Sequence, residues 1–122
     1  MTDAEREPAR DPQDLERLLV ARQRVGDIEG MVALFEPSAV IHTDDGRFIR
    51  GHEAMREFYR EIEAAGRVFA VGEQQPALVH EELALTSTRS LGGGVTAEVA
   101  RRQPDGTWLW VIDRYEIARE RL

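Results

Sequence analysis

Asp113 has the clearest capacity for acid–base chemistry in this sequence, because it interrupts an apolar run. The run is Trp-Leu-Trp-Val-Ile at residues 108–112, and Asp113-Arg114-Tyr115 follows it. A carboxylate buried in such a strand is costly unless it is paired or used. We therefore expect Asp113 to act as a general acid or base, with a charge pair to Arg114 or a place at a sheet edge as the structural alternative.

Two histidines and one tyrosine are further candidates. His42 lies between Ile41 and Thr43, and a neutral imidazole can serve as a general base or a metal ligand. His80 lies in Leu-Val-His-Glu-Glu, which lacks the spacing of a helical zinc motif, so no metal site is expected. Tyr59 belongs to an apolar helical stripe, from which its hydroxyl can reach a pocket. For each histidine the alternative is a hydrogen-bonded or surface side chain.

The first part of the chain predicts a tail and two helices. Residues 1–10 are charged and offer almost nothing to bury, so we expect a frayed tail. Asp11 followed by Pro12 is a helix start signal, because the carboxylate accepts orphan N–H groups and proline has none. Gly26-Asp27 predicts a tight corner to a second helix, which ends before Pro37.

The pattern then changes from helical to alternating. Asp45-Gly46 predicts a hairpin turn, because this pair tolerates the positive φ angles required there. Apolar residues at i, i+3, i+4 and i+7 predict a third helix from Gly51 to near Gly66. After that helix the period is two, which predicts strands at residues 67–73, 77–82, 83–90, 94–103 and 107–117.

Helices first and strands last indicate an α+β domain, with three N-terminal helices packed on one face of a curved antiparallel sheet. In a regular last strand, Trp108, Trp110 and Ile112 share one face, and Leu109 and Val111 share the other. One layer of helices cannot cover both faces. We therefore expect a homodimer through the second face, with the tryptophans in the core or the interface.

Composition limits the partners of the protein. The 122 residues suit one domain, expected at residues 11–122. A net charge of -7 disfavours nucleic acid, and no apolar run is long enough for a membrane span. There is no cysteine, and the start MTDAEREPAR does not resemble a signal peptide, so a cytoplasmic location is expected.

Several segments together resemble the nuclear-transport-factor-2-like superfamily, in particular its SnoaL-like and ketosteroid-isomerase-like branch of small bacterial proteins. They are RVGDIEGMVALFEPSAVIHTDDGRFIRGHEAMREFY and the closing RRQPDGTWLWVID. The likeness covers residues 11–117. It implies a cone of three helices and a strongly bent sheet around an apolar pocket, usually in a homodimer. It does not fix the reaction, because this scaffold serves enzymes and binders alike.

The resemblance also bears on individual residues. The position that carries the general base in ketosteroid isomerases falls on Thr43, and threonine is no base near neutral pH. Residues 15–26 contain no tyrosine that could donate a hydrogen bond to the oxyanion. A shift of the alignment by one residue would place Asp44 at the position of the base. Asp-Arg-Tyr at residues 113–115 is loosely similar to the last strand of limonene-type epoxide hydrolases, where two carboxylates and an arginine activate water. Glu98 and Arg101 are possible partners, but their opposite parity keeps them from facing one pocket.

Two functions remain open at this point. One is a cofactor-independent acid–base isomerase, cyclase or hydrolase acting on a small apolar metabolite, with Asp113 and His42 as catalytic candidates. The other is a non-catalytic ligand-binding or accessory homodimer. In both cases we expect Tyr59, Thr43, Trp110 and Glu98 to contact the ligand, and we expect no metal or cofactor.

Overall fold

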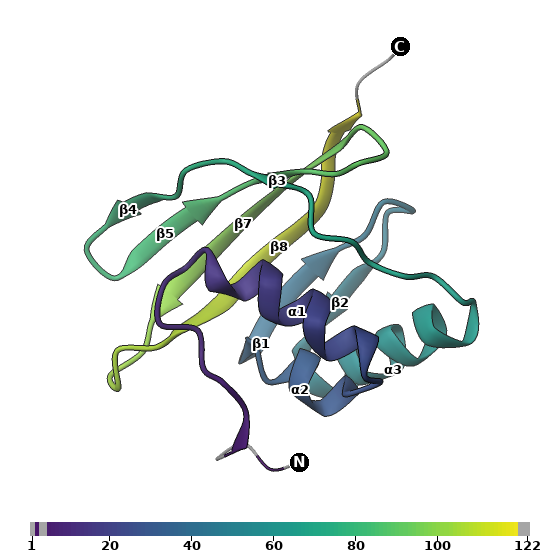
Figure 1. The fold of residues 1–122 in the computed structure, drawn as a ribbon, viewed down its shortest axis with the longest axis horizontal. Helices are drawn as coiled ribbons and strands as arrows, with labels where there is room; N and C mark the ends of the chain where they lie inside the picture. Colours follow the sequence, from purple (N-terminus) through teal and green to yellow (C-terminus); the bar gives the residue numbers. More distant parts are fainter. Residues whose placement is uncertain (1, 3–4, 120–122) are drawn as a thin grey trace.

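Three helices and one curled sheet make up the part of the chain that the computed structural model describes, residues 2 and 5–119 (Figure 1). The helices are α1 (Asp14–Arg24), α2 (Ile28–Val32) and α3 (Gly51–Ala64). The α+β class and the order of helices before most strands are confirmed.

Local signals explain where the helices begin and end. The Asp27 carboxylate accepts the backbone N–H of Gly30 at 3.0 Å and caps α2, as the Gly26-Asp27 pair predicts. Helix α1 begins later than expected, at Asp14, because residues 11–13 form a turn that the Asp11 side chain closes onto the Gln13 N–H. Helix α2 is also short, since β1 begins before Pro37.

The strands form a single sheet in the described residues. Its order is β2-β1-β8-β7-β5-β4, β6 also pairs with β7, and β3 pairs with β6. Every pairing is antiparallel except that of β1 with β8. The bounds are β1 (Phe35–His42), β2 (Phe48–Arg50), β3 (Glu73–Gln74), β4 (Leu78–His80), β5 (Leu83–Thr86), β6 (Thr88–Arg89), β7 (Gly94–Arg102) and β8 (Trp108–Arg119).

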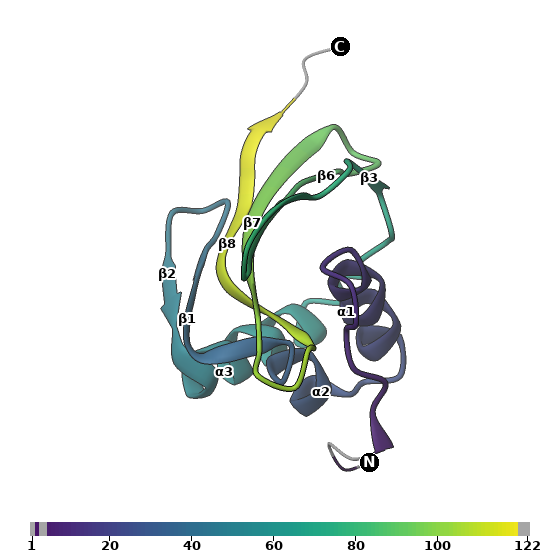
Figure 2. The same cartoon turned by 90° about the vertical axis from the view of Figure 1, so that its left-hand side faces the viewer.

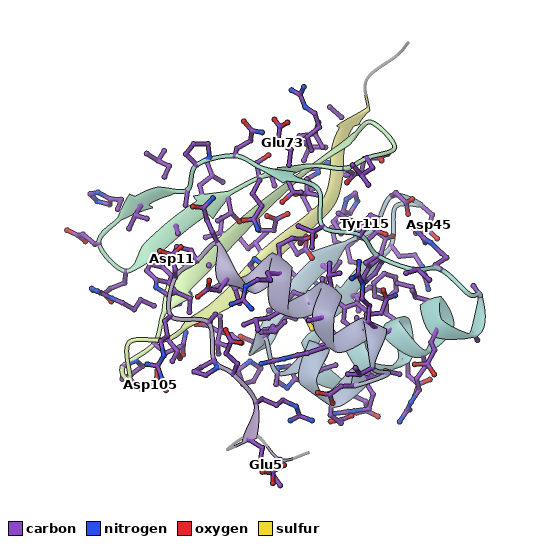
Figure 3. The ribbon with its side chains drawn as sticks, viewed as in Figure 1. Glu5, Asp11, Asp45, Glu73, Asp105 and Tyr115 are labelled. Carbon is purple, nitrogen blue, oxygen red and sulfur yellow. The ribbon has the colours of Figure 1, made fainter. Side chains whose placement is uncertain are left out.

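Turns of the expected chemistry connect the paired strands. Gly46, with φ 89°, lies in the β1–β2 hairpin, and Gly106, with φ 85°, lies in the turn before β8. Asp105 accepts the Thr107 N–H at 3.0 Å and holds the second turn. Figure 3 shows Asp45 and Asp105 at the outer tips of these turns, away from the centre of the molecule.

The sheet curls around the helices, so that its inner face and α1 lie opposite each other across a gap (Figure 2). Between them the apolar side chains form one core, in which Trp110 contacts Phe35 with ring centroids 5.1 Å apart. The largest fully buried side chains are Trp110, Phe35, Leu15, Met31, Ile41, Met55, Val20 and Val32.

A β-bulge in β8 changes which residues face this core. Ala100 pairs with Trp110, but Val99 pairs with Ile112, so Val111 is one extra residue in β8. The extra residue reverses the parity of the strand: Trp110 and Asp113 both lie buried, whereas Ile112 is 48% exposed. The regular alternation predicted for residues 108–112 is therefore wrong at Ile112, and both tryptophans belong to the core rather than to an outer interface.

Residues 67–72 do not form the strand that their alternation predicts. The Gln23 side chain satisfies their backbone instead: it accepts the Phe69 N–H at 2.6 Å and donates to the Arg67 carbonyl at 2.9 Å. Strand pairing begins only at β3. Just before it, the backbone of Gly72 lies so close to Arg89 that a Cβ atom on Gly72 would be 2.4 Å from the Arg89 carbonyl oxygen.

Residues 5–10 are held more firmly than a frayed tail would be. The Arg6 guanidinium donates to both Asp27 carboxylate oxygens at 2.8 Å, and the Ala9 carbonyl accepts the Trp108 N–H at 2.8 Å. The Ala9 side chain is buried in the core. The low apolar content of this segment predicted a frayed tail, but an ion pair and a backbone hydrogen bond hold it against the rest of the protein.

A search of the described residues for a helix with the length and apolarity that a bilayer crossing requires finds none.

Candidate functional site

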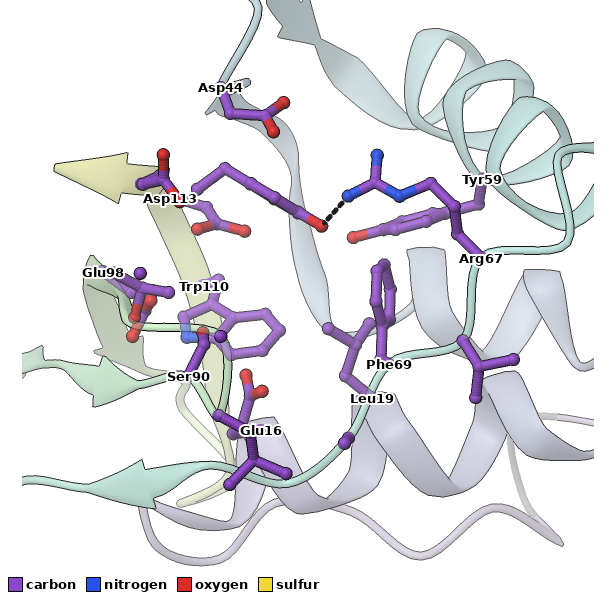
Figure 4. A pocket seen from close by; sticks show the side chains of 18 residues that line it. Glu16, Leu19, Asp44, Tyr59, Arg67, Phe69, Ser90, Glu98, Trp110 and Asp113 are labelled. Carbon is purple, nitrogen blue, oxygen red and sulfur yellow. Dashed lines mark hydrogen bonds between the residues drawn. The ribbon is translucent and has the colours of Figure 1, made fainter. Parts of the chain in front are cut away.

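A cavity of about 350 Å³ opens between the inner face of the sheet and helices α1 and α3 (Figure 4). Strands β7 and β8 form one wall, and the segment after α3 passes along the opposite side. The lining residues are Glu16, Leu19, Asp44, Tyr59, Arg67, Val68, Phe69, Ala70, Ser90, Leu91, Gly92, Gly94, Thr96, Glu98, Trp110, Asp113, Tyr115 and Glu116.

Asp113 lies at the centre of the sheet wall, where the bulge in β8 turns it inward. Its residue is only 9% exposed, and no hydrogen bond to its carboxyl is found in the described part of the chain. Burial raises its pKa well above the usual range, and the neighbouring Glu98 and Glu16 carboxylates raise it further. The raised pKa favours the protonated form of the Asp113 carboxyl.

Glu98 is the direct cross-strand neighbour of Asp113. Paired residues on one face of a sheet have Cβ atoms about 4.5–5.5 Å apart, so the two carboxyls share one environment. Burial raises the Glu98 pKa, while hydrogen bonds from Thr96 and Thr86 lower it in part. The Thr86 hydroxyl donates to Glu98 Oε1 at 2.8 Å and fixes the orientation of the group.

Glu16 is a third carboxyl in this cavity, and the reading of the sequence missed it. It projects from α1 towards the sheet, and burial together with the Glu98 charge raises its pKa to about 7. The signal that could have found it is helical spacing: Glu16 is three and four residues before Leu19 and Val20, both of which are buried. An acid on the apolar stripe of a helix must face either the core or a cavity.

Tyr59 faces the carboxyls from α3, and Figure 4 shows its hydroxyl and the Asp113 carboxyl pointing into the same space. Burial raises the Tyr59 pKa well above 10, with the Asp113 charge as a second cause, so the phenol stays a neutral hydrogen-bond donor. At the rim, Arg67 donates to the Tyr115 hydroxyl at 2.9 Å. Trp110 contributes its ring to the wall, and its indole nitrogen is buried without a hydrogen-bond partner in the described residues.

Two candidates from the sequence lie outside the cavity lining. His42 packs on Phe48 with ring centroids 4.7 Å apart, and it alternates with the buried Ile41 on β1. The Thr43 hydroxyl donates to the Asp45 carboxylate and accepts the Arg47 N–H, which closes the hairpin turn. The fold brings neither of them to Asp113.

The remaining candidates divide between the rim and the outside. Asp44 lines the mouth of the cavity, and His80 is exposed in β4. Arg101 is also exposed and pairs with Glu36 at 3.0 Å, while Glu98 on the same strand is buried. The parity argument that separated Glu98 from Arg101 is therefore confirmed.

A curled sheet, three helices and a buried set of acids beside a tyrosine define a small α+β pocket domain. Residues 15–122 match the SnoaL-like domain, and the chain belongs to this family. No curated protein matches the sequence.

Solved structures support the same fold. A variant of a protein of unknown function from Mycobacterium tuberculosis has a TM-score of 0.72 at 22% identity, over 90% of this chain and 74% of the other. A domain of unknown function with a cystatin-like fold from Nostoc punctiforme has a TM-score of 0.66 at 16% identity, over 89% and 75%. A ketosteroid isomerase-like protein from Erwinia carotovora atroseptica has 0.65 at 12%, over 87% and 93%. At these identities the likeness concerns the fold alone.

Proposed function

We propose that the protein is an enzyme that carries out cofactor-independent acid–base chemistry on a small molecule bound in this cavity. The observation that supports it best is the set of three buried or partly buried carboxyls, Asp113, Glu98 and Glu16, which share one cavity with raised pKa values. Strongly perturbed acids in a cleft are typical of catalytic sites, because an uncompensated buried charge is otherwise costly.

The cluster can hold an acid and a base at the same time. Close carboxyls do not all ionise together, so one group carries negative charge while another keeps its proton. Glu16, with a pKa of about 7, ionises near neutral pH, while burial raises the pKa of Asp113 well above its ordinary range. The pair therefore has the separated proton affinities that general acid–base catalysis requires.

A carbonyl substrate illustrates the proton balance. Glu16 removes a proton from the carbon beside the carbonyl, and the Asp113 hydroxyl gives its proton to the carbonyl oxygen, which yields the neutral enol. The Tyr59 hydroxyl donates a hydrogen bond to that same oxygen. With a conjugated double bond, Glu16 returns the proton at another carbon while the enol hydroxyl gives its proton back to Asp113, which completes an isomerisation. In a cyclisation the enol carbon attacks a second carbonyl, the new alkoxide takes the proton from Glu16, and the enol hydroxyl proton returns to Asp113. An epoxide oxygen protonated by Asp113 is opened by a water molecule whose proton goes to Glu16.

A non-catalytic ligand-binding role is the alternative, and the apolar part of the wall favours it. Val68, Phe69 and Leu91 line the cavity with no chemistry of their own. Such a protein would hold an apolar ligand by burial and use the acids only for orientation.

Proton exchange distinguishes the two functions. We expect the protein to accelerate deuterium uptake beside the carbonyl of small cyclic ketones, or the opening of cyclic epoxides, and Asp113→Asn to abolish the effect. The matched control is Glu82→Gln, which removes an exposed acid paired with Arg102 outside the cavity. A protein that binds the ligand but catalyses deuterium uptake or epoxide opening no faster than the Asp113→Asn variant would contradict catalysis and support the binding role.

We also propose a homodimer through the outer face of the sheet. Leu78, Leu85, Val99, Ile112 and Val40 are paired from strand to strand and form one outer apolar row across β4, β5, β7, β8 and β1. Leu78, Leu85 and Ile112 are 68%, 49% and 48% exposed. A contiguous apolar row on a solvent face is typical of an interface, and a second copy offers a self-complementary surface.

A further inference from the structure

The described lining of the cavity holds more acids than bases. Glu16, Asp44, Glu98, Asp113 and Glu116 line it, and Arg67 is the one basic lining residue that the described chain provides. Arg67 is exposed at the mouth, where it donates to the Tyr115 hydroxyl and lies over the Tyr115 ring. The inner acids therefore have no cationic partner among the described lining residues.

The Asp113 carboxyl is the second, independent sign of a ligand. It is nine-tenths buried, points into the cavity and has no hydrogen-bond partner in the described residues (Figure 4). Because the carboxyl opens onto the cavity and not onto protein donors, it is free to accept a hydrogen bond from a donor that a ligand brings.

Aromatic rings form the wall opposite these acids. Tyr59 and Phe69 meet edge to face at 6.5 Å, and Phe69 lies 6.4 Å from Tyr115. Rings of this kind bury an apolar body and also attract a cation placed over their faces. The inner wall offers an anionic ligand no cation, because Arg67 at the rim is the one basic residue in the described lining.

We propose that the ligand of this cavity is a small aromatic or alicyclic amine whose protonated nitrogen lies among Glu16, Glu98 and Asp113. The inference rests on the proposed function, because it names the substrate class of the same site. The ammonium group supplies the donors that Asp113 lacks, and the ring of the ligand packs on Tyr59 and Phe69. A bare metal ion is disfavoured, since the described residues contain no group of three metal ligands with suitable geometry.

Proton linkage follows from this arrangement. Burial raises the pKa of each inner acid in the empty cavity, and an ammonium group lowers these pKa values as a counter-charge, so binding releases protons. The groups facing the nitrogen are Glu16 from α1, Glu98 from β7, Asp113 from β8 and the neutral Tyr59 hydroxyl from α3; Asp44, Glu116 and the Arg67–Tyr115 pair lie nearer the rim. Affinity for an amine therefore rises with pH as Glu16 ionises, near pH 7.

Calorimetric titration with matched probes tests the proposal. The probes are 2-phenylethylamine, 2-phenylethanol and 3-phenylpropanoate, with the cyclohexyl analogues as a second series. We expect the amine to bind about tenfold or more tightly than the alcohol, because hydrogen bonds between charged groups are stronger than those between neutral groups, and the propanoate to bind most weakly. Titration in two buffers with different ionisation enthalpies should show net proton release for the amine and none for the alcohol.

The double variant Glu98→Gln/Asp113→Asn should lose the preference for the amine and keep its affinity for the alcohol, while Glu82→Gln should behave as the unmodified protein. A melting curve on each variant verifies folding, and Glu16→Gln alone serves if the double variant does not fold. Equal binding of amine and alcohol, preference for the propanoate, or no amine binding in either series at millimolar concentration would overturn the proposal. Turnover of uncharged substrates by a protein that does not prefer amines would contradict this inference and leave the proposed catalysis standing. Binding of the amine without turnover of any substrate would contradict the proposed catalysis and leave this inference standing.

Discussion

The two faces of the sheet carry side chains of the opposite polarity to that expected from their exposure to water. The inner face buries the carboxyls Glu98 and Asp113, and the outer face exposes the apolar row that contains Leu85 and Ile112. Both arrangements cost stability in an isolated chain, since buried charge and exposed apolar surface are each unfavourable. This contrast is the reason why we propose a ligand for the inner face and a second copy for the outer face.

Two neighbouring residues of β8 lie on opposite faces of the sheet. Ile112 points outward and Asp113 inward because the bulge at Val111 sets the phase of β8. Substitutions at these two positions should therefore have separate consequences, one for chemistry and one for assembly.

Asp113→Asn should give the largest effect, a loss of turnover of about 10²–10⁴-fold, which is the usual contribution of a general acid or base. The substitution keeps the shape of the side chain and removes its titration, so the folded protein should melt at the same or a slightly higher temperature. Steady-state kinetics and a melting curve measure the two quantities. A lower melting temperature with full activity would mean that Asp113 is a structural residue.

Ile112→Glu should weaken the dimer by about a hundredfold or more, because it places a charge in the middle of the outer apolar row. Leu85→Glu on β5 should act in the same way. The matched control is Val25→Glu, which alters an exposed apolar residue at the end of α1, away from this face. Sedimentation velocity at micromolar concentration gives the measurement, and an unmodified protein that sediments as a monomer would end the dimer proposal.

Stability should fall as pH rises through neutrality. Glu16 has a folded-state pKa of about 7 against an ordinary value of 4.5, so the folded state binds more protons than the unfolded state between these values. The contribution is fully present below pH 4.5 and is lost as pH rises through 7, for a total of roughly 3 kcal/mol at most. Glu98 and Asp113 shift in the same direction.

Urea unfolding from about pH 4.5, the ordinary pKa of Glu16, to above its folded-state pKa of about 7 measures this slope. Glu16→Gln should flatten it, because glutamine does not titrate, whereas Glu82→Gln should leave it unchanged. A protein whose unfolding free energy rises steadily from acid to neutral pH would show that the cavity acids are ionised and compensated in the folded state.

The sequence was a good guide to local structure and a poor guide to the direction of side chains. The Gly26-Asp27 corner, the Asp45-Gly46 turn and the third helix follow from short-range rules of capping, turn geometry and helical period, and all three are present. Residues 67–72 failed as a strand because a distant side chain, Gln23, takes their backbone hydrogen bonds. Local alternation carries no information about such a contact.

The site depended on a feature that no short-range rule fixes. A regular β8 would place Asp113 on the face of Leu109, opposite Trp110, and only the bulge at Val111 brings it to Glu98. Asp113, Glu98, Tyr59 and Trp110 were chosen by residue type and do line the cavity, while His42 and Thr43 do not. Glu16 was overlooked because an acid in the first turn of a helix is expected to be a dipole partner exposed to solvent.

Thr43 should give the smallest effect, and it tests the distinction between this site and that of the ketosteroid isomerases. Its hydroxyl closes the β1–β2 turn through Asp45 and Arg47, so Thr43→Ala should lower the unfolding free energy by about 1 kcal/mol and leave turnover unchanged. With a turn residue in the place of the base, the protein should not isomerise a Δ5-3-ketosteroid at an enzyme-like rate. Absorbance of the conjugated product follows that reaction directly. Steroid turnover that survives Asp113→Asn and disappears in Asp44→Ala would mean that chemistry takes place at the rim, and the buried acids of the inner face would then be reserved for binding.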